Sequence, residues 1–160
     1  MRAVMLIRPA VERDAPALSR VLLDIIAITG RMRPHDPDFT LSHYIANRDS
    51  VRCSVALDAE GTVMGFQSLV RAVPGNRYDV PEGWGIIGTH ISPRAHRRGV
   101  GTALFAATRP AAVAAGLPRI DACIGADNAM GLRYYEAMGF RTWREGDGIV
   151  QKMLVVTPDG

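Results

Sequence analysis

The middle of the chain places a strand, a helix and a second strand in direct succession. Residues 84–93, WGIIGTHISP, predict a strand that ends at Pro93, and residues 119–126, RIDACIGA, predict another. Between them, apolar residues recur with a helical period from Val100, and Gly116 closes the pattern. The apolar face comprises Val100, Ala103, Leu104, Ala107, Ala111 and Ala114. A helix that connects two strands in this way favours a parallel strand pair within one sheet.

The segments on either side predict antiparallel pairing. Residues 51–57 and 62–73 form a hairpin around the turn DAEG, and residues 141–156 form another around EGDG. The other predicted elements are a strand at 4–10, a helix at 12–30 with Asp14 as N-cap, a loop at 31–39, a short helix at 40–50 capped by Thr40, a loop at 74–83 and a short helix at 127–140 capped by Asp127 or Asn128. In the central helix, Pro110 predicts a kink or a short break. The pattern is typical of the α+β class, with a mostly antiparallel sheet and one parallel pair.

Length and charge narrow the kind of protein. A chain of 160 residues suits one domain over residues 1–160. The net charge of +3 is modest, and basic residues are dispersed apart from Arg94, Arg97 and Arg98, which favours a local anion site over a nucleic-acid surface. No apolar run approaches the roughly 18 residues that cross a membrane. The apolar stretch before Arg8 is too short for a signal peptide, so we expect a cytoplasmic protein.

The two cysteines carry no recognisable chemistry. Cys53 and Cys123 make neither a disulfide framework nor a metal motif, and no metal is expected. Each lies in an apolar segment with strand character, so we expect both to be buried thiols.

The turn after Pro93 combines basic residues, glycines and a helix start, in the stretch RAHRRGVGTALFAA. The first N–H groups of a helix lack acceptors within it, and the dipole adds about half a positive charge there. Gly99 and Gly101 permit a sharp turn and remove side chains that would keep a phosphate away. Arg97 and Arg98 add positive charge. The stretch indicates a pyrophosphate site; the alternative is a glycine-rich turn with solvated arginines.

Two other phosphate-binding motifs do not fit. A P-loop requires Lys followed by Ser or Thr after its last glycine, but Thr102 and Ala103 follow Gly101. The sequence GWGIIG at residues 83–88 matches the dinucleotide pattern literally. It lies in the predicted strand, however, and no helix follows before Pro93. We therefore expect neither of these nucleotide-binding folds.

The stretches ISPRAHRRGVGTAL and NAMGLRYYEAMGF resemble two motifs of the GNAT superfamily of acyl-CoA-dependent N-acyltransferases. The first is similar to the family's coenzyme-binding turn, with Gly99 and Gly101 at the glycine positions. His96 stands where the family has Gln or Arg, a mild departure because the family binds pyrophosphate mainly through backbone N–H groups. The resemblance covers residues 84–141.

The second stretch is similar to the family's later helix. Asn128 opens it, Gly131 replaces a usual small residue and Tyr135 occupies the tyrosine position. Gly139 and Phe140 end it. Both motifs occur in the family's order, and each lies on the element predicted for it.

The resemblance implies a mixed sheet of six to seven strands flanked by about four helices, whose fourth and fifth strands splay apart around acetyl-CoA. The strand before Pro93 would offer backbone groups of His90, Ile91 and Ser92 to the pantetheine arm. The following turn would hold the pyrophosphate through His96, Arg97, Arg98, Gly99, Val100, Gly101 and Thr102.

The later helix would bring further residues to the coenzyme. Asn128 either bonds the pantetheine or a loop, or merely caps its helix. Gly131 lies one turn before Tyr135 on the same face and would leave room for the coenzyme. Tyr135 is the candidate acid for the departing thiolate, with a packed aromatic that only touches the coenzyme as the alternative. Tyr134 is expected to pack in the core.

The general base stays open between several residues. His90 lies in the strand that would present the thioester, and its unperturbed pKa of about 6.5 suits proton transfer. It acts as base, lines the substrate pocket or is an ordinary strand histidine. Glu82 is a second candidate base, against the alternative of a solvated carboxylate. His35, Asp36 and Asp38 lie in the proline-bounded loop and face either the acceptor or solvent.

The expected activity is an N-acetyltransferase that uses acetyl-CoA on the amine of a small molecule, by direct attack in a ternary complex. The short proline-rich loop at 30–39 favours a closed pocket, and the sequence is similar to members of the phosphinothricin type. The alternatives are a peptide or protein N-acetyltransferase and a non-catalytic acyl-CoA-binding module. We expect no nucleic-acid or membrane partner, and a homodimer is a further hypothesis.

Overall fold

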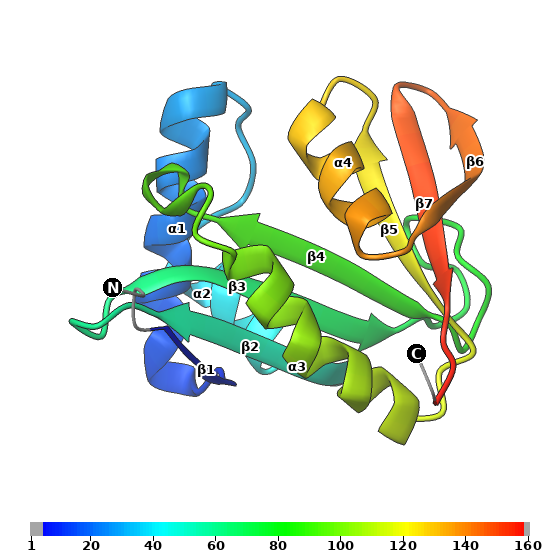
Figure 1. Cartoon of the computed structure of the whole chain (residues 1–160), viewed down its shortest axis with the longest axis horizontal. Coiled ribbons are helices and arrows are strands. Elements are labelled where there is room, and N and C mark those ends of the chain that lie inside the picture. The colour runs from blue at the N-terminus through cyan, green and yellow to red at the C-terminus, as the bar shows by residue number, and fades with distance from the viewer. Residues whose placement is uncertain (1–4, 159–160) are drawn as a thin grey trace.

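Residues 5–158, which the computed structural model describes, contain seven strands in one mixed sheet (Figure 1). The strands are β1 (Leu6–Pro9), β2 (Ser50–Leu57), β3 (Val63–Arg71), β4 (Gly85–Ile91), β5 (Arg119–Gly125), β6 (Arg141–Gly146) and β7 (Ile149–Val155). They lie in the order β1-β2-β3-β4-β5-β7-β6, and all neighbours are antiparallel except β4 and β5. The predicted α+β fold is confirmed; Val4, where the first predicted strand begins, lies outside the described residues.

Helices cover both faces of this sheet. The α-helices of the described residues are α1 (Ala15–Thr29), α2 (Pro37–Thr40), α3 (Val100–Ala114) and α4 (Ala129–Ala137). Figure 1 shows α3 and α4 in front of the sheet and α1 and α2 behind it. Leu18 and Leu22 of α1 pack with Phe66 of β3 in one core, whereas Phe105 of α3 and Tyr135 of α4 belong to another. Within residues 5–158, no helix has the length and apolar character that crossing a bilayer requires.

The second helix begins earlier than predicted. Asp36 is its N-cap and accepts a hydrogen bond from Phe39 N at 3.3 Å, so the prediction of Thr40 as the cap is wrong. After α2 the chain continues through a π-helical turn at Leu41–Ile45. The Thr40 hydroxyl is buried and donates to Ala15 O at 2.8 Å. This bond ties α2 to the start of α1, a tertiary role that outweighs local capping.

Helix α3 differs from its prediction in two respects. It runs unbroken from Val100 to Ala114, so the break expected at Pro110 is absent from this helix. Its buried face is also rotated from the predicted alanine stripe. The fully buried residues of α3 are Val100, Gly101, Leu104, Phe105, Thr108 and Ala112, while Ala114 is exposed. Burying the ring of Phe105 removes more apolar surface from water than burying the alanine methyl groups, which explains the rotation.

Strands β4 and β5 pair over only part of their length. The parallel register joins Gly85 to Ile120, Ile86 to Asp121 and Ile87 to Ala122. Beyond these pairs β4 stays with β3 up to Ile91, while β5 stays with β7 up to Gly125. In Figure 1 the two strands start side by side and then diverge. The splay predicted from the family resemblance is therefore present.

The cysteines occupy different environments. Cys53 of β2 is buried, and Cys123 of β5 is only half-buried. The prediction of buried thiols is therefore confirmed for Cys53 and wrong for Cys123. The reason is the splay, because Cys123 follows the last residue of β5 that pairs with β4.

Candidate active site

The turn before α3 presents bare backbone N–H groups. Arg97 and Gly99 have positive φ angles of 65° and 75°, and the helix begins at Val100 with no side-chain cap. The first hydrogen bond into the helix runs from Ala103 N to Gly99 O at 3.0 Å. Among residues 5–158, the N–H groups from Gly99 to Thr102 have no protein acceptor. Because these donors lie at the positive end of the helix dipole, the turn is suited to bind an anion.

Basic side chains surround this turn unevenly. Arg97 and Arg98 are exposed, and the Arg98 guanidinium lies 3.8 Å from the Met64 sulfur. Arg94 instead pairs with Asp24 at 3.6 Å. His96 is exposed as well, so it lies at the edge of the turn. The positive charge available to a bound anion therefore comes from Arg97 and Arg98 together with the backbone.

Packing within the protein explains why two positions of the family motifs are glycine. A Cβ at Gly101 would lie 2.6 Å from Cε1 of Tyr134. A Cβ at Gly131 would lie 2.7 Å from Nδ2 of Asn128. Asn128 caps α4, its Oδ1 accepting from Gly131 N at 3.0 Å. The Asn128 cap is therefore a reason within the protein for Gly131, and the room that Gly131 would leave for a coenzyme stays a prediction. A Cβ at Gly99, in contrast, would meet nothing within 4 Å.

A network of polar side chains lies on the α3 face at the start of the splay. Gln67 is fully buried; its Oε1 accepts from the Thr108 hydroxyl, and its Nε2 donates to Thr89 Oγ1 at 2.9 Å and to Tyr134 Oη at 3.0 Å. Tyr134 Oη donates in turn to Gly101 O at 2.7 Å. The network therefore connects strands β3 and β4 to the first turn of α3, and all four groups are satisfied.

Tyr135 bonds to β4 through its hydroxyl. It lies 2.8 Å from Thr89 Oγ1, and the ring packs edge-on against Phe140 at 5.2 Å between centroids. Burial raises the pKa of Tyr135, and the hydrogen bonds from Thr89 only partly oppose that rise. Tyr135 is therefore a protonated phenol at neutral pH. Tyr134 is more than the core residue expected, because its buried hydroxyl, with a pKa of about 12, joins the network.

The backbone of β4 offers fewer groups than expected. Ser92 N donates to Met64 O at 2.8 Å, and Ser92 O accepts from Ala95 N at 2.9 Å. The backbone N–H of Ser92, which the family resemblance implied would serve the pantetheine arm, is thus already bonded within the protein. Since successive residues of an antiparallel strand direct their backbone groups to opposite sides, Ile91 and Thr89 face the splay, whereas His90 faces β3.

The opposite face of β4 carries what we call the basic aromatic cluster. Its members are Arg33, Phe39, His43, Tyr44, Phe66 and His90. The His90 ring lies 4.8 Å from that of Phe66 and 5.5 Å from that of Tyr44, between centroids. Burial, and to a smaller extent the charges of Arg33 and His43, lower the pKa of His90 to about 3. His90 is therefore neutral at physiological pH and a very weak base.

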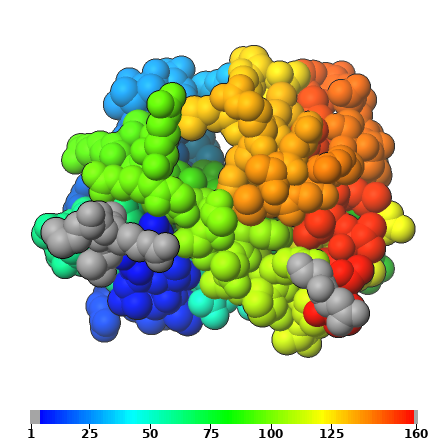
Figure 2. All heavy atoms as spheres, viewed as in Figure 1, coloured from blue at the N-terminus to red at the C-terminus, as the bar shows by residue number. Residues whose placement is uncertain are grey.

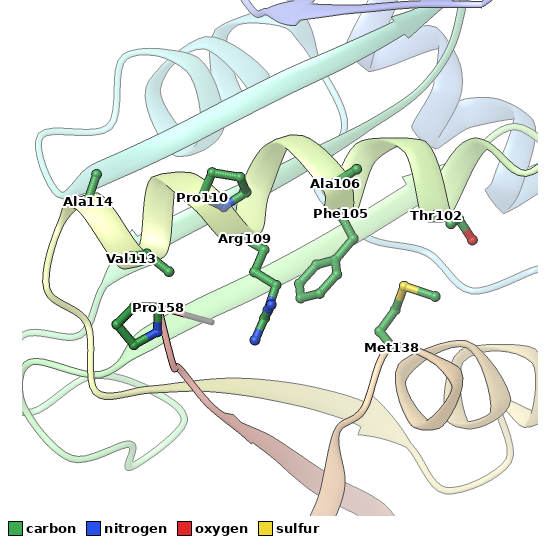
Figure 3. Close-up of a pocket in the computed structure, with 9 residues that line it drawn as sticks. All are labelled: Thr102, Phe105, Ala106, Arg109, Pro110, Val113, Ala114, Met138 and Pro158. Carbon is green, nitrogen blue, oxygen red and sulfur yellow. The ribbon is translucent and has the colours of Figure 1, made fainter. Parts of the chain in front are cut away.

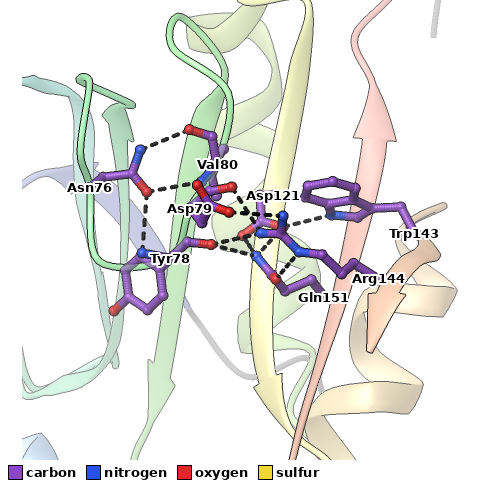
Figure 4. Close-up of polar contacts among 8 residues, drawn as sticks. All are labelled: Asn76, Tyr78, Asp79, Val80, Asp121, Trp143, Arg144 and Gln151. Carbon is purple, nitrogen blue, oxygen red and sulfur yellow. Dashed lines mark hydrogen bonds and ion pairs between the residues drawn. The ribbon is translucent and has the colours of Figure 1, made fainter. Parts of the chain in front are cut away.

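Loop residues 72–84 are fixed over this face by polar contacts that the sequence analysis missed (Figure 4). Arg144 donates to Tyr78 O at 2.8 Å and to Gln151 Oε1 at 2.7 Å. Asp121, fully buried on β5, accepts from Trp143 Nε1 at 2.8 Å. Burial raises the pKa of Asp121, although Trp143 and Gln151 oppose the rise. No local signal marks these residues, because their partners lie far apart in sequence.

The remaining candidates lie at the edge of the site. Glu82 and Asp38 are exposed, and Asp36 serves as the helix cap described above. His35 is half-buried, and its Nδ1 is enclosed without a hydrogen-bond partner among residues 5–158. Arg31 forms an ion pair with Asp127, which joins the loop after α1 to the turn after β5. The structure therefore supports the solvated alternative for Glu82.

The space-filling view shows a notch beside the bare turn. It lies between the green atoms of the β4–α3 segment and the yellow-to-orange atoms of α4 (Figure 2). A separate groove of about 590 Å³ runs along α3 from Thr102 to Ala114, with Met138 and Pro158 from other segments in its lining (Figure 3). Its lining is mostly apolar, with Phe105 and Met138 at one end. Neither Tyr135 nor His90 lines this groove, so the reactive groups lie elsewhere.

Comparison with known proteins gives one family match. Residues 20–140 match the model of the acetyltransferase (GNAT) family. That range includes the bare turn, the splayed strands and α4.

Solved structures share the whole fold. A GCN5-related N-acetyltransferase from Kribbella flavida is 21% identical, with a TM-score of 0.77 over 94% of this chain and 97% of that one. A phosphinothricin acetyltransferase from Sinorhizobium meliloti in complex with acetyl-CoA is 19% identical, with a TM-score of 0.75 over 98% and 89%. A ribosomal-protein-alanine N-acetyltransferase from Brucella melitensis is 21% identical, with a TM-score of 0.75 over 94% and 99%. The last two names denote different acceptors, so the fold alone does not determine the acceptor.

Proposed function

Because the chain belongs to the GNAT family of acetyltransferases, we propose that it transfers the acetyl group of acetyl-CoA to the amine of a small molecule, by direct attack in a ternary complex. The observation that carries this proposal is the bare turn of α3, which opens beside the splay where Thr89 and Tyr135 meet. Such a turn binds a pyrophosphate, and the splay gives the attached arm a path between β4 and β5.

The residues of the turn fit the donor. Two linked phosphates would satisfy the N–H groups from Gly99 to Thr102, with Arg97 and Arg98 adding charge from the solvent side. The N–H and C=O of Ile91 face the open side of β4 and would bond the pantetheine amides. When bound, acetyl-CoA supplies a thioester whose acyl carbon is open to attack by a neutral amine.

Tyr135 is the acid in this proposal. It holds a proton at neutral pH because burial raises its pKa, and its hydroxyl lies at the splay. A departing sulfur requires a proton, which a phenol in this position can donate. Thr89 positions the hydroxyl by hydrogen bonding to it. Backbone N–H groups of β4 would stabilise the charge that develops on the carbonyl oxygen.

In this proposal His90 is not the general base. It lines the acceptor side of the site, by which we mean the face of β4 toward α1 and α2, where the amine would bind. A pKa of about 3 leaves too little proton affinity for a general base at neutral pH. It fits better as a neutral wall, packed against Phe66 and Tyr44. The proton of the acceptor ammonium would then leave through solvent.

Contacts between the segments on the acceptor side favour a small molecule over a peptide in this proposal. The loop after α1 is joined to the turn after β5 through Arg31 and Asp127, and residues 72–84 are fixed on the same face by Arg144. A peptide would require an open groove between these segments. The likeness to a phosphinothricin acetyltransferase agrees with a small acceptor, and the ribosomal-protein-alanine acetyltransferase represents the alternative.

An acetylation assay tests the proposal. Purified protein is incubated with acetyl-CoA and a panel of small amines and amino acids, and free CoA is followed by thiol titration. A parallel panel of short peptides with different N-termini tests the alternative acceptor. We expect amine-dependent CoA release with small molecules. Turnover with peptides only would refute the small-molecule assignment, and the absence of heat on titration with acetyl-CoA would refute the donor site.

A further inference from the structure

Arg33 has no anionic partner within the protein. Among residues 5–158, no carboxylate lies within 4.0 Å of its guanidinium, in contrast to Arg8, which pairs with Asp14 at 2.8 Å. The only hydrogen bond of the Arg33 side chain there is from one terminal nitrogen to Tyr44 Oη, at 2.6 Å. Its Nε is enclosed and has no acceptor. Arg33 as a whole is half-buried, but leaving its enclosed Nε donor without an acceptor costs about 1–3 kcal/mol, so the site is incomplete without an anion.

Among residues 5–158, the charged groups that act on the two histidines near Arg33 are all positive. The pKa of His43 is lowered by burial first and then by the charges of Arg33 and Arg77. The pKa of His90 is lowered by burial and then by Arg33 and His43. No acidic residue contributes to either shift. His35 adds a second enclosed polar nitrogen without a partner, two residues after Arg33.

The side chains that hold Arg33 are rigid. Tyr44 is buried, and its ring meets those of Phe39 and Phe66 edge-on, at 5.8 Å and 5.0 Å between centroids. The hydroxyl that accepts from Arg33 is therefore fixed before any ligand arrives. A preformed charged donor costs little to reorganise when an anion binds.

The contacts of Arg33 place it on the same side of β4 as His90. Arg33 bonds the Tyr44 hydroxyl at 2.6 Å, and the Tyr44 ring lies 5.5 Å from that of His90. His90 is adjacent in β4 to Thr89, the residue that bonds Tyr135. An anion on Arg33 would therefore bind on the His90 face while the amine of the same molecule reaches the splay. The rings of Phe39, Tyr44 and Phe66 offer an apolar wall to the rest of it.

We propose, building on the acetyltransferase function above, that the acceptor is an amine with a carboxylate close to it, as in an α-amino acid, and that Arg33 binds this carboxylate through its guanidinium, whose Nε is enclosed. The same chemistry accommodates another small oxyanion, such as a phosphinate, in the carboxylate's place. Arg33 is then a specificity-determining residue that contacts substrate.

The test compares matched acceptors. L-amino acids, their primary amides and the corresponding decarboxylated amines are assayed with acetyl-CoA, together with phosphinothricin as an amino acid that carries a second oxyanion. We expect kcat/KM for the acids to exceed that for the amides and amines by about 100-fold, because only the acids pair the buried charge. Arg33→Gln should raise KM for the acids about 100-fold and leave that for acetyl-CoA unchanged. Arg33→Lys should retain part of the binding, since lysine keeps the charge but loses the planar fork.

Arg20→Gln is the matched control, because Arg20 is an exposed arginine on α1. Circular dichroism and acetyl-CoA titration establish that each variant folds. Equal rates for acids and amides, or an equal loss for both in Arg33→Gln, would overturn the inference.

Binding separates this inference from the proposed function. Calorimetry of the amino acids against the CoA-loaded protein is carried out whether or not turnover occurs. Arg33-dependent binding without acetylation would uphold the anion site and refute the acetyl-transfer proposal for these acceptors. Acetylation of amines without Arg33-dependent binding of any acid would uphold the activity and refute the site. Neither binding nor acetylation of any acid would refute the anion site.

Discussion

The two faces of β4 differ in how completely their polar groups are paired. On the face toward α3 and α4, Thr89 lies in a network in which Gln67 and Tyr134 are fully bonded. On the face toward α1 and α2, His90 lies among rings and beside Arg33, whose charge has no counter-ion among the described residues. Among the described residues, the bare groups on the first face belong to the backbone, at the turn before α3 and on the side of β4 that β5 leaves open.

The difference indicates two kinds of recognition. The face toward α3 and α4, which we call the donor face because acetyl-CoA would bind there, would hold its ligand through backbone N–H groups, which any chain with a similar turn can supply. The face toward α1 and α2, which we call the acceptor face, would select its ligand through side chains from separate segments. Each face can be altered without the other, because adjacent residues of a strand point in opposite directions.

Removing the Tyr135 hydroxyl should produce the largest effect, and it concerns the donor face. We expect Tyr135→Phe to lower kcat by about 100-fold or more while acetyl-CoA binding persists, because the acid is lost but the ring remains. Thr89 keeps its bond from Gln67, so the fold should survive. The matched variant Tyr134→Phe removes the neighbouring hydroxyl and should change kcat only a few-fold. Equal losses in both variants, with chemistry rate-limiting, would show that the network acts as a whole.

An acid-stability measurement tests the acceptor face. The folded protein holds the pKa of His90 near 3, whereas the unfolded chain has a value of 6.5. Protons therefore favour the unfolded chain as the pH falls below 6.5, and full stability is present above it. His90 should lower the free energy of unfolding by roughly 2 kcal/mol at pH 5 relative to neutral pH, because each pH unit below the pKa of the unfolded chain costs about 1.4 kcal/mol.

Urea denaturation at the two pH values checks this. His90→Phe should lose less stability on acidification than the unmodified chain, whereas His96→Gln, at an exposed position, should behave like it. His43 contributes in the same direction in all three proteins, because its pKa is lowered too. An identical acid response in His90→Phe would show that this histidine is not buried in a positive environment.

The smallest expected effect separates turn geometry from ligand binding. Gly99 and Gly116 lie at the two ends of α3 with φ angles of 75° and 70°, and a Cβ at either would meet nothing within 4 Å. Replacing either by alanine should cost about 1–2 kcal/mol of unfolding free energy through backbone strain. Only Gly99→Ala should also weaken acetyl-CoA binding, by about 10-fold in calorimetry. Equal affinities in the two variants would exclude the turn as the phosphate site.

The order of elements, the parallel pair and the glycine turn could be predicted from the amino-acid sequence. These follow from local patterns: alternation in strands, helical periodicity from Val100, and glycine where φ is positive. The resemblance of two short motifs to the GNAT family added two predictions, that β4 and β5 splay apart and that Tyr135 is the candidate acid. Predictions from local patterns are wrong for the Thr40 cap and for the buried face of α3, because burial against distant residues outweighs capping and periodicity.

Which side chains meet in the folded protein could not be predicted in this way. Gly101 is glycine because Tyr134 packs against it, and Asp121 is buried because Trp143 and Gln151 bond to it. The enclosed charge of Arg33 depends on Tyr44, which lies in the next helical segment, and on strands further along the chain. Contacts of this kind leave no periodic signal, because the free energy of pairing or burying a group depends on neighbours that the fold alone brings together.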